Sequence, residues 1–401
     1  MKFIDLAAQQ KRIREKIESN IAAVLDHGMY IMGPEIGQLE ERLADFAGVR
    51  HAIGCASGTD ALLMALLTHQ VGPGDAVFTT PFTFIATAEV VRLAGATPVF
   101  VDIDPDTFNI DVAALELAIE AVENADATIH PLPITNNPLP VTSKGIIAVD
   151  LFGLPADYAK IERIARQHGL FVIEDAAQSF GAELNGRKAC SFGDIGCTSF
   201  FPAKPLGCYG DGGMCFTDDE RLADIMRSLR VHGKGNHKYD NVRIGLNGRL
   251  DTLQAAILQA KFDIFPEEIK LRRQAADRYR SLLKSCADIR CPDIPQGYHS
   301  AWAQYCVLSQ NAPHRALLQS RLQEAQIPTA IYYPKPLHLQ QAFAELDYRP
   351  GDFAVSEKNC ERIFSLPMHP YLTATEQQKI ADVILMKKGM RAITPGGVRS
   401  G

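Results

Sequence analysis

Lys204 has the most unusual setting among the residues of this sequence that could do chemistry. It lies in the stretch TSFFPAKPLGCYGDGG (198–213), where its nearest neighbours are apolar, aromatic or proline. Apolar surroundings favour the neutral form of an amine, and a neutral amine is a nucleophile toward a carbonyl carbon. The alternative is an ordinary surface lysine whose ammonium group reaches water past its own apolar stem.

Two carboxylates stand at the end of another apolar run. Glu174 and Asp175 end the strand-like part of LFVIEDAA (170–177), and Gln178 follows. A carboxylate at the end of a buried strand costs free energy unless a cation or hydrogen-bond donors stabilise it. We therefore expect a positive partner for Asp175. The alternative is an aspartate that caps a following helix.

Three further pieces could hold a flat ligand that carries an anionic group. Ser57-Gly58-Thr59 stands where an apolar run gives way to the helical pattern of GTDALLMALLTH, and a helix N-terminus favours anions. Ser199 adds a hydroxyl group shortly before Lys204, and Phe84 in PFTFIATAEVV offers a flat face. The alternatives are an ordinary helix cap and a core phenylalanine.

Together these pieces fit pyridoxal 5'-phosphate, which needs a lysine, a carboxylate, phosphate-binding donors and a stacking ring. Lys204 would form the Schiff base, and Asp175 would hold the pyridine nitrogen protonated. The remaining groups would contact the phosphate, the ring face and the ring hydroxyl: Ser57, Gly58, Thr59 and Ser199, then Phe84, then Gln178.

The elements that must position these residues form an alternating pattern. Apolar runs separated by helical segments indicate an α/β fold with a mostly parallel sheet covered by helices. In such a sheet, ligands bind beyond the carboxyl ends of the strands, so the loops after the runs should carry the chemistry. The expected strands lie within residues 51–57, 75–82, 97–103, 145–152, 170–177, 197–203 and 212–217.

The pattern changes after residue 250 and predicts two domains. Residues 1–250 form a large α/β domain with an N-terminal helix, and residues 251–390 a smaller C-terminal α+β domain. In the latter we expect two helices meeting near Pro266, a strand within 301–309, and helices near 312–325 and 374–388. Residues 391–401 lack periodicity, which predicts a disordered tail. The proline-rich segment 123–144 is predicted to be a surface insertion outside the sheet, with a plain mobile loop as the alternative.

Composition narrows the classes of protein. A net charge of −6 at pH 7 argues against a nucleic-acid-binding surface and suits small-molecule partners. No run approaches the roughly 18 apolar residues of a membrane span, and the early charges exclude a signal peptide. Nine cysteines without a C-x-x-C pair indicate free thiols in the cytoplasm, with neither disulfides nor a metal site.

These motifs together resemble the DegT/DnrJ/StrS family of nucleotide-sugar aminotransferases, on the type I aspartate-aminotransferase fold. The resemblance runs from FIDLAAQ at residue 3 to the final helix. It rests on YIMGPEIGQLEERLADFAGVRHAIGCASGTDAL, PFTFIATA, VFVDIDPDTFNID, IEDAAQSFGA, SFFPAKPLG, GDGG and GRLDTLQAAIL.

The resemblance implies a role for each matching residue. Lys204 would bind the cofactor covalently and then move protons, and Asp175 would pair with the pyridinium nitrogen. Gly58, Thr59 and Ser199 would hold the phosphate, Phe84 would stack on the ring, and Gln178 would contact its oxygen. The family builds its active sites across a homodimer, in which Asn247 would reach the partner's phosphate. A dehydratase branch carries histidine at the lysine position, and Lys204 argues against that branch.

The resemblance is strongest around VRIGLNGRLDTLQAAIL, in the branch that aminates C3 of UDP-2-acetamido-2-deoxy-3-keto-glucuronic acid with glutamate as the amino donor. That branch makes diamino sugars for lipopolysaccharide O-antigens. Arg249 would bind the sugar carboxylate through a fork of donors, and the alternative is an arginine paired within the protein. The loop AIYYPKPLHLQQAF offers Tyr332, Tyr333 and His338 as further substrate-binding candidates. Relatives often carry histidine where Tyr332 stands.

Two other functions stay open on the sequence. One keeps the fold and changes the reaction to C4 amination of a UDP- or dTDP-4-keto-6-deoxy sugar. The other is a regulatory protein that binds pyridoxal phosphate without turnover, because a fold alone does not establish activity.

Overall fold

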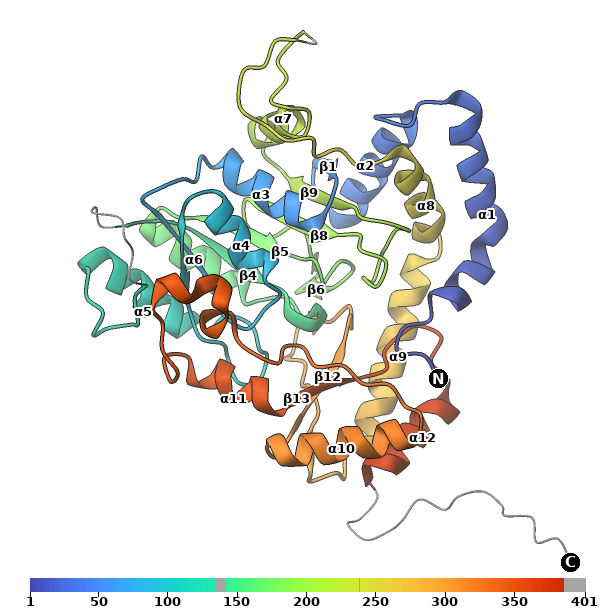
Figure 1. Ribbon diagram of the computed structural model, residues 1–401. Helices are drawn as coiled ribbons and strands as arrows, with labels where there is room; N and C mark the ends of the chain where they lie inside the picture. Colours follow the sequence, from blue (N-terminus) through green and yellow to red (C-terminus); the bar gives the residue numbers. More distant parts are fainter. Residues whose placement is uncertain (134–140, 238, 386–401) are drawn as a thin grey trace, which may run out of the picture.

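A seven-stranded sheet forms the centre of the computed structural model, which describes residues 1–133, 141–237 and 239–385 (Figure 1). The strands, in spatial order, are β1 (His51–Cys55), β9 (Gly213–Thr217), β8 (Ile195–Ser199), β5 (Phe171–Asp175), β4 (Thr142–Val149), β2 (Asp75–Thr79) and β3 (Thr97–Phe100). Only β9 runs antiparallel to its neighbours. Each of the seven expected runs overlaps one of these strands, although β4 and β8 begin a few residues earlier than expected, so the predicted α/β sheet is confirmed.

Helices cover both faces of the sheet because the strands alternate apolar side chains between two buried faces. Ile147 and Ile173 pack toward α3 (Gly58–Thr68), α4 (Ala86–Leu93) and α7 (Glu220–Leu229). Ile146 and Val172 pack on the other face, toward α5 (Val112–Asn124) and α6 (Tyr158–His168). Side chains at the N-caps fix where helices begin, since Ser57, Asp111, Asp157 and Asp219 each accept a first-turn N–H.

Long helices join the large sheet to the rest of the chain. The N-terminal helix α1 (Leu6–His27) and α2 (Pro34–Ala47) both pack against α8 (Thr252–Phe262). The next helix, α9 (Phe265–Leu283), runs from there to the second sheet (Figure 1). Two helices therefore meet near Pro266, as the sequence predicts.

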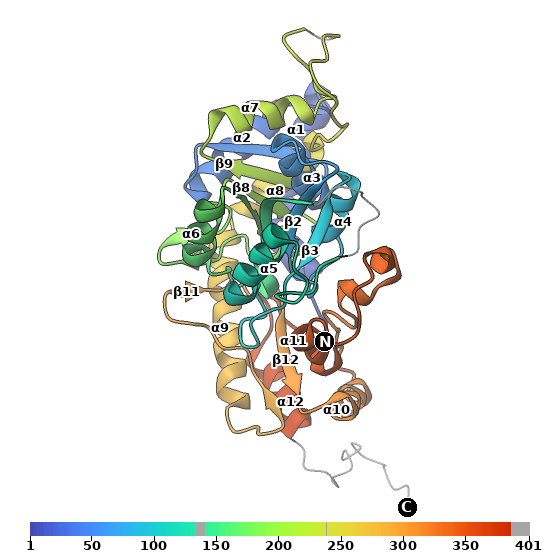
Figure 2. The ribbon, with the colours of Figure 1, turned by 90° about the vertical axis from the view of Figure 1, so that its left-hand side faces the viewer.

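The second sheet lies beneath the large one (Figure 2). It is antiparallel and consists of β10 (Ile289–Arg290), β12 (Tyr305–Ser309) and β13 (Ile363–Leu366). Helices α10 (Ala312–Glu324), α11 (Ala354–Arg362) and α12 (Ala374–Leu385) accompany it. A third small sheet pairs β11 (Tyr298–His299), β6 (Glu183–Leu184) and β7 (Arg187–Lys188), and short 3₁₀ helices span Leu151–Gly153, Leu337–Leu339 and Gln341–Leu346.

The predicted bounds of the insertion, 123–144, are too wide at both ends. Helix α5 continues to Asn124, and β4 already begins at Thr142, where it pairs with Asp75 of β2. Residues 134–140 lie outside the described residues, as does the predicted tail at 391–401. The domain division at residue 250 stays a prediction. Over the described ranges, we find no helix long and apolar enough to cross a membrane.

Candidate active site

A cavity of about 420 Å³ lies beyond the carboxyl ends of β5 and β8, and we call it the Lys204 cavity. Strand β5 ends at Asp175, β8 ends at Ser199, and the loop after β8 carries Lys204. Most of the residues singled out from the sequence line this cavity: Ser57, Gly58, Thr59, Phe84, Asp175, Gln178, Ser199, Lys204, Tyr332 and Tyr333. The topology thus brings together groups that lie far apart along the chain.

Lys204 and Asp175 influence each other's ionisation. Burial lowers the pKa of the Lys204 amine, while the nearby negative charge of Asp175 opposes that shift. Burial likewise raises the pKa of Asp175, and two hydrogen bonds and the charge of Lys204 oppose that shift. The pair therefore combines a lysine whose neutral form is favoured with a carboxylate that retains partners for its negative charge.

Thr87 was missed by the sequence analysis, although it orients Asp175. Its Oγ1 donates a hydrogen bond to Oδ2 of Asp175 at 2.8 Å, and the backbone N–H of Ala177 donates to Oδ1 at 3.2 Å. Thr83 lies beside Thr87, with 3.3 Å between the hydroxyl oxygens. Thr83 precedes the first turn of α4, so a helical spacing did not reveal this pair, and only the presence of two threonines in FTFIATAEV hinted at it.

The N-terminus of α3 forms a tightly packed corner of the cavity. Oγ of Ser57 accepts from the N–H of Asp60 at 3.0 Å and caps the helix. Gly58 allows a close approach, because a Cβ at this position would lie 2.6 Å from Cβ of Ser199. The first N–H groups of the helix have no partner within it, so this corner is suited to an anion.

Phe84 is 56% exposed and lines the cavity, which excludes the alternative of a core phenylalanine. Its ring offers an apolar face to a ligand rather than to the protein interior. Phe201, which is 52% exposed, also lines the cavity and was not predicted.

Both ends of the Gln178 carboxamide are hydrogen-bonded to other groups of the protein. Its Oε1 accepts from the N–H of Phe152 at 2.8 Å, and its Nε2 donates to the hydroxyl of Tyr333 at 3.2 Å. Burial raises the pKa of Tyr333, so its hydroxyl stays protonated. The side chain of Gln178 is therefore fixed at the cavity edge together with Tyr333.

Asn247 and Arg249 lie outside the Lys204 cavity in this chain. They line a neighbouring cavity of about 590 Å³, which shares Ser57 and Asp211 with the Lys204 cavity. The backbone here is held by the bridge of Arg249 to Cys55 and by the bond from the N–H of Ala56 to Gly248 O at 3.0 Å. Arg249 donates to the side chain of Asn247, and no ion pair to a carboxylate is found for it among the described residues.

His338 is not brought to the cavity. Its side chain is buried, with Nε2 3.1 Å from Oε1 of Glu357 and its ring 4.7 Å from that of Phe353. Burial lowers the pKa of His338, and Glu357 opposes that shift. The 3₁₀ helix at Leu337–Leu339 thus turns His338 into an aromatic core, although Tyr332 and Tyr333 of the same loop line the cavity.

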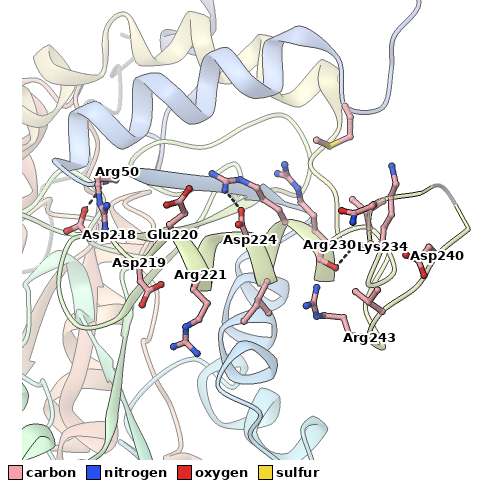
Figure 3. Close-up of a pocket in the computed structure, with 18 residues that line it drawn as sticks. Arg50, Asp218, Asp219, Glu220, Arg221, Asp224, Arg230, Lys234, Asp240 and Arg243 are labelled. Atoms are coloured by element: carbon pink, nitrogen blue, oxygen red, sulfur yellow. Dashed lines mark hydrogen bonds and ion pairs between the residues drawn. The ribbon is translucent and has the colours of Figure 1, made fainter.

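A separate, wider hollow of about 1580 Å³ lies along α7 and the loop after it (Figure 3). Its charges are of both signs and are partly neutralised locally. Asp218 accepts from the backbone N–H of Arg50 at 2.9 Å, and Asp224 pairs with Arg227 at 2.9 Å. This hollow is lined by none of the residues that the sequence singled out for cofactor chemistry.

Comparison with known proteins agrees with this geometry. The model of the DegT/DnrJ/EryC1/StrS aminotransferase family matches residues 11–385. The chain is 47% identical over 372 residues to the UDP-2-acetamido-2-deoxy-3-oxo-D-glucuronate aminotransferase of Pseudomonas aeruginosa, covering 93% of this chain and 96% of that protein. It is 42% identical over 382 residues to the UDP-N-acetyl-3-dehydro-alpha-D-glucosamine 3-aminotransferase of Acidithiobacillus ferrooxidans, covering 95% and 96%.

Solved structures of other proteins share the fold of this chain. A DegT DnrJ EryC1 StrS aminotransferase from Brucella abortus has a TM-score of 0.89 and 50% identity, over 96% of this chain and 98% of that one. NtdA from Bacillus subtilis, solved with bound cofactor PMP, has a TM-score of 0.82 and 30% identity, over 95% and 82%. The family match, the sequence identities and the shared fold lead to one conclusion: the chain belongs to the DegT/DnrJ/EryC1/StrS aminotransferase family.

Proposed function

We propose that the protein binds pyridoxal 5'-phosphate in the Lys204 cavity and moves an amino group from glutamate to C3 of UDP-2-acetamido-2-deoxy-3-keto-glucuronic acid. The observation that carries this proposal is the convergence of Lys204, Asp175 and the N-terminus of α3 on one cavity. The substrate follows the Pseudomonas aeruginosa relative, whose name specifies that reaction class. A role in making diamino sugars for lipopolysaccharide O-antigens follows from the same resemblance.

The residues of the cavity fit this cofactor. The corner at Gly58, where a Cβ would meet Ser199, leaves room for a phosphate beside the first N–H groups of α3. Asp175 is held by Thr87 and Ala177 so that a carboxylate oxygen can face a protonated ring nitrogen, and Phe84 offers a ring face. When bound, pyridoxal phosphate withdraws electrons from the carbon that carries the substrate amine.

Lys204 would move the protons of the reaction at its Nζ. Because burial favours its neutral form, Nζ can take a proton from the amine-bearing carbon of glutamate. In the second half of the reaction, it returns a proton to C3 of the sugar. Burial raises the pKa of Asp175, and its hydrogen bonds to Thr87 and Ala177 oppose that shift and favour the carboxylate that would face the protonated ring nitrogen.

Arg249 would bind the sugar carboxylate. Its position beside Asn247, without a carboxylate partner in the described part of the chain, supports a free guanidinium fork rather than an internal ion pair. We expect Arg249→Gln to lower kcat/KM for the uronate substrate about 10- to 100-fold, because a hydrogen bond to a charged group is lost. An uncharged UDP-sugar tested in parallel should change little. Equal losses on both substrates would contradict the uronate and leave a neutral sugar, such as a 4-keto-6-deoxy sugar.

A homodimer with shared active sites is part of the proposal. Asn247 and Arg249 line a cavity that only adjoins the Lys204 cavity of their own chain. Nearby apolar side chains are exposed, namely Met29, Tyr30, Ile31, Val242 and Ile244. Exposed apolar residues in such a group favour a protein interface, and a second copy would bring Asn247 to the neighbouring phosphate. Sedimentation of the protein at micromolar concentration should give the mass of a dimer, and a monomer would contradict this part.

The cytoplasm is the proposed compartment. All nine cysteines are free, and seven of them are buried. Free thiols in this number are typical of a reducing environment.

One experiment tests the function as a whole. The protein with bound pyridoxal phosphate is mixed with glutamate, and its visible absorbance is followed before a panel of keto nucleotide sugars is added. We expect glutamate to bleach the band and the 3-keto uronate to restore it with formation of the aminated sugar. Failure of glutamate to bleach the band would instead support a regulatory protein that binds the cofactor without turnover.

A further inference from the structure

The Lys204 cavity has two walls of different origin. The first consists of strand-end residues of the large sheet, which carry the groups proposed to bind the cofactor. The second, which we call the outer wall, comes from the N-terminal segment and from the chain after residue 300. The outer wall consists of Phe3, Ile4, Ala303, Gln304, Tyr332 and Tyr333.

Gln304 is the outer-wall residue in which a buried polar atom lacks a hydrogen-bond partner within the described part of the chain. Its carboxamide oxygen is buried and has no hydrogen-bond partner among the residues that the structure describes. Gln178, in the same cavity, is the opposite case, because both ends of its carboxamide are bonded to Phe152 and Tyr333. An unpaired buried carboxamide oxygen costs free energy, so a water molecule, an ion or a ligand that pairs with it is favoured.

The backbone around Gln304 is held rigidly against the core of the large sheet. The N–H of Ala301 donates to Gly153 O at 2.9 Å, and a Cβ on Gly153 would lie 2.8 Å from Trp302 N and 3.1 Å from Gln178 O. Trp302 is further fixed by the bond from Arg272 to its carbonyl oxygen at 3.1 Å. Gln304 directly follows this packed segment and precedes β12, so its carboxamide is carried by an ordered backbone.

We propose that Gln304 binds the sugar, and that its carboxamide hydrogen-bonds a hydroxyl or acetamido group of the nucleotide-linked substrate. This inference rests on the proposed function. The unpaired atom of Gln304 is an acceptor, so it needs a donor, and a sugar hydroxyl or an acetamido N–H supplies one whereas a carboxylate does not. The only donor of glutamate is the amine that is transferred in the reaction, so Gln304 would act in the sugar half of the reaction.

The two half-reactions provide the test. In Gln304→Leu, which keeps the bulk and removes the hydrogen bonds, we expect KM for the keto sugar to rise about tenfold with a smaller change in kcat. The rate at which glutamate bleaches the cofactor band should stay within about twofold of the wild type. Gln323→Leu, at an exposed position of α10, is the matched control and should leave both half-reactions unchanged.

A second variant keeps the test decisive if Gln304→Leu folds poorly. Gln304→Asn retains the carboxamide on a shorter stem, and we expect an intermediate rise in KM for the sugar with a normal melting temperature. An unchanged KM for the sugar in both variants would overturn the inference, as would equal losses in the two half-reactions. Failure of the wild type to react with glutamate would instead contradict the proposed function, so the two failures are distinguishable.

Discussion

Two lysines, Lys204 and Lys261, have their pKa lowered by burial, yet their surroundings differ. Lys261 is fully buried in α8, where its Nζ donates to Gly207 O at 2.6 Å and lies 4.3 Å from the ring centre of Tyr209. Lys204 is half-buried, lines a cavity and faces the charge of Asp175. A lowered pKa is therefore common to a structural lysine and to a candidate catalytic one. Access to the cavity distinguishes them, because the negative charge of Glu268 also acts on Lys261.

Removing the carboxylate partner should have the largest effect on turnover. We expect Asp175→Asn to lower the rate of the glutamate half-reaction on the order of 100- to 1000-fold, because a preorganised charge at the reacting group is lost. Stopped-flow absorbance of the cofactor band measures this rate. Asp211→Asn, at another carboxylate that lines the cavity, is the control and should have a much smaller effect. Similar losses in both variants would remove the special role of Asp175.

Thr87 should matter through Asp175, with a smaller effect. Thr87→Val keeps the shape of the side chain and removes the hydrogen bond to Oδ2 of Asp175, so we expect about a tenfold loss in the same half-reaction. Because that bond favours the charged carboxylate, its loss should raise the pKa of Asp175 further, and the acidic limb of the pH–rate profile should move to higher pH.

The control for Thr87 is another buried threonine. Thr68 donates its hydroxyl to Met64 O at 2.7 Å within α3, away from the cavity lining. Thr68→Val should leave the pH–rate profile in place. A profile that does not move in Thr87→Val would show that Thr87 does not act on the ionisation of Asp175.

Lys261 should have the smallest effect on turnover and a clear effect on stability. In Lys261→Met we expect the glutamate half-reaction to stay within about twofold of the wild type, since this lysine does not line the cavity. Burial lowers the pKa of Lys261 from 10.5 to about 8. Between these values the unfolded chain binds more protons than the folded one, so the free energy of unfolding of the wild type should rise with pH relative to the variant. Urea unfolding at pH 7.5 and pH 10 compares the two. Equal differences at both pH values would contradict this assignment.

The position of Lys204 also shows which parts of the site could be predicted from the sequence. Asp175 ends a buried strand, and Lys204 and Ser57-Gly58-Thr59 follow buried strands. These strands run in the same direction, so their carboxyl ends meet at one edge of the sheet whatever the details of packing. Their meeting was therefore predictable from the order of apolar runs and helices.

The outer wall was less predictable because it depends on how distant segments pack. The bond from the N–H of Met368 to Phe3 O at 3.2 Å anchors the N-terminal segment beside the cavity, and no local pattern encodes that contact. His338 was predicted to bind substrate because of its position in the sequence, and that prediction is not supported by its placement. It lies close in sequence to Tyr332 and Tyr333, but the 3₁₀ helix that follows Pro336 packs its ring against Phe353.

The most direct test of the central claim is to find which lysine carries the cofactor. The protein is loaded with pyridoxal phosphate, reduced with borohydride and digested, and the modified peptide is identified by mass spectrometry. We predict the cofactor mass on Lys204 in the wild type and its absence at that position in Lys204→Ala, with the peptide of Lys261 unmodified in both. A modified Lys261, or an unchanged yield of adduct in Lys204→Ala, would contradict the account.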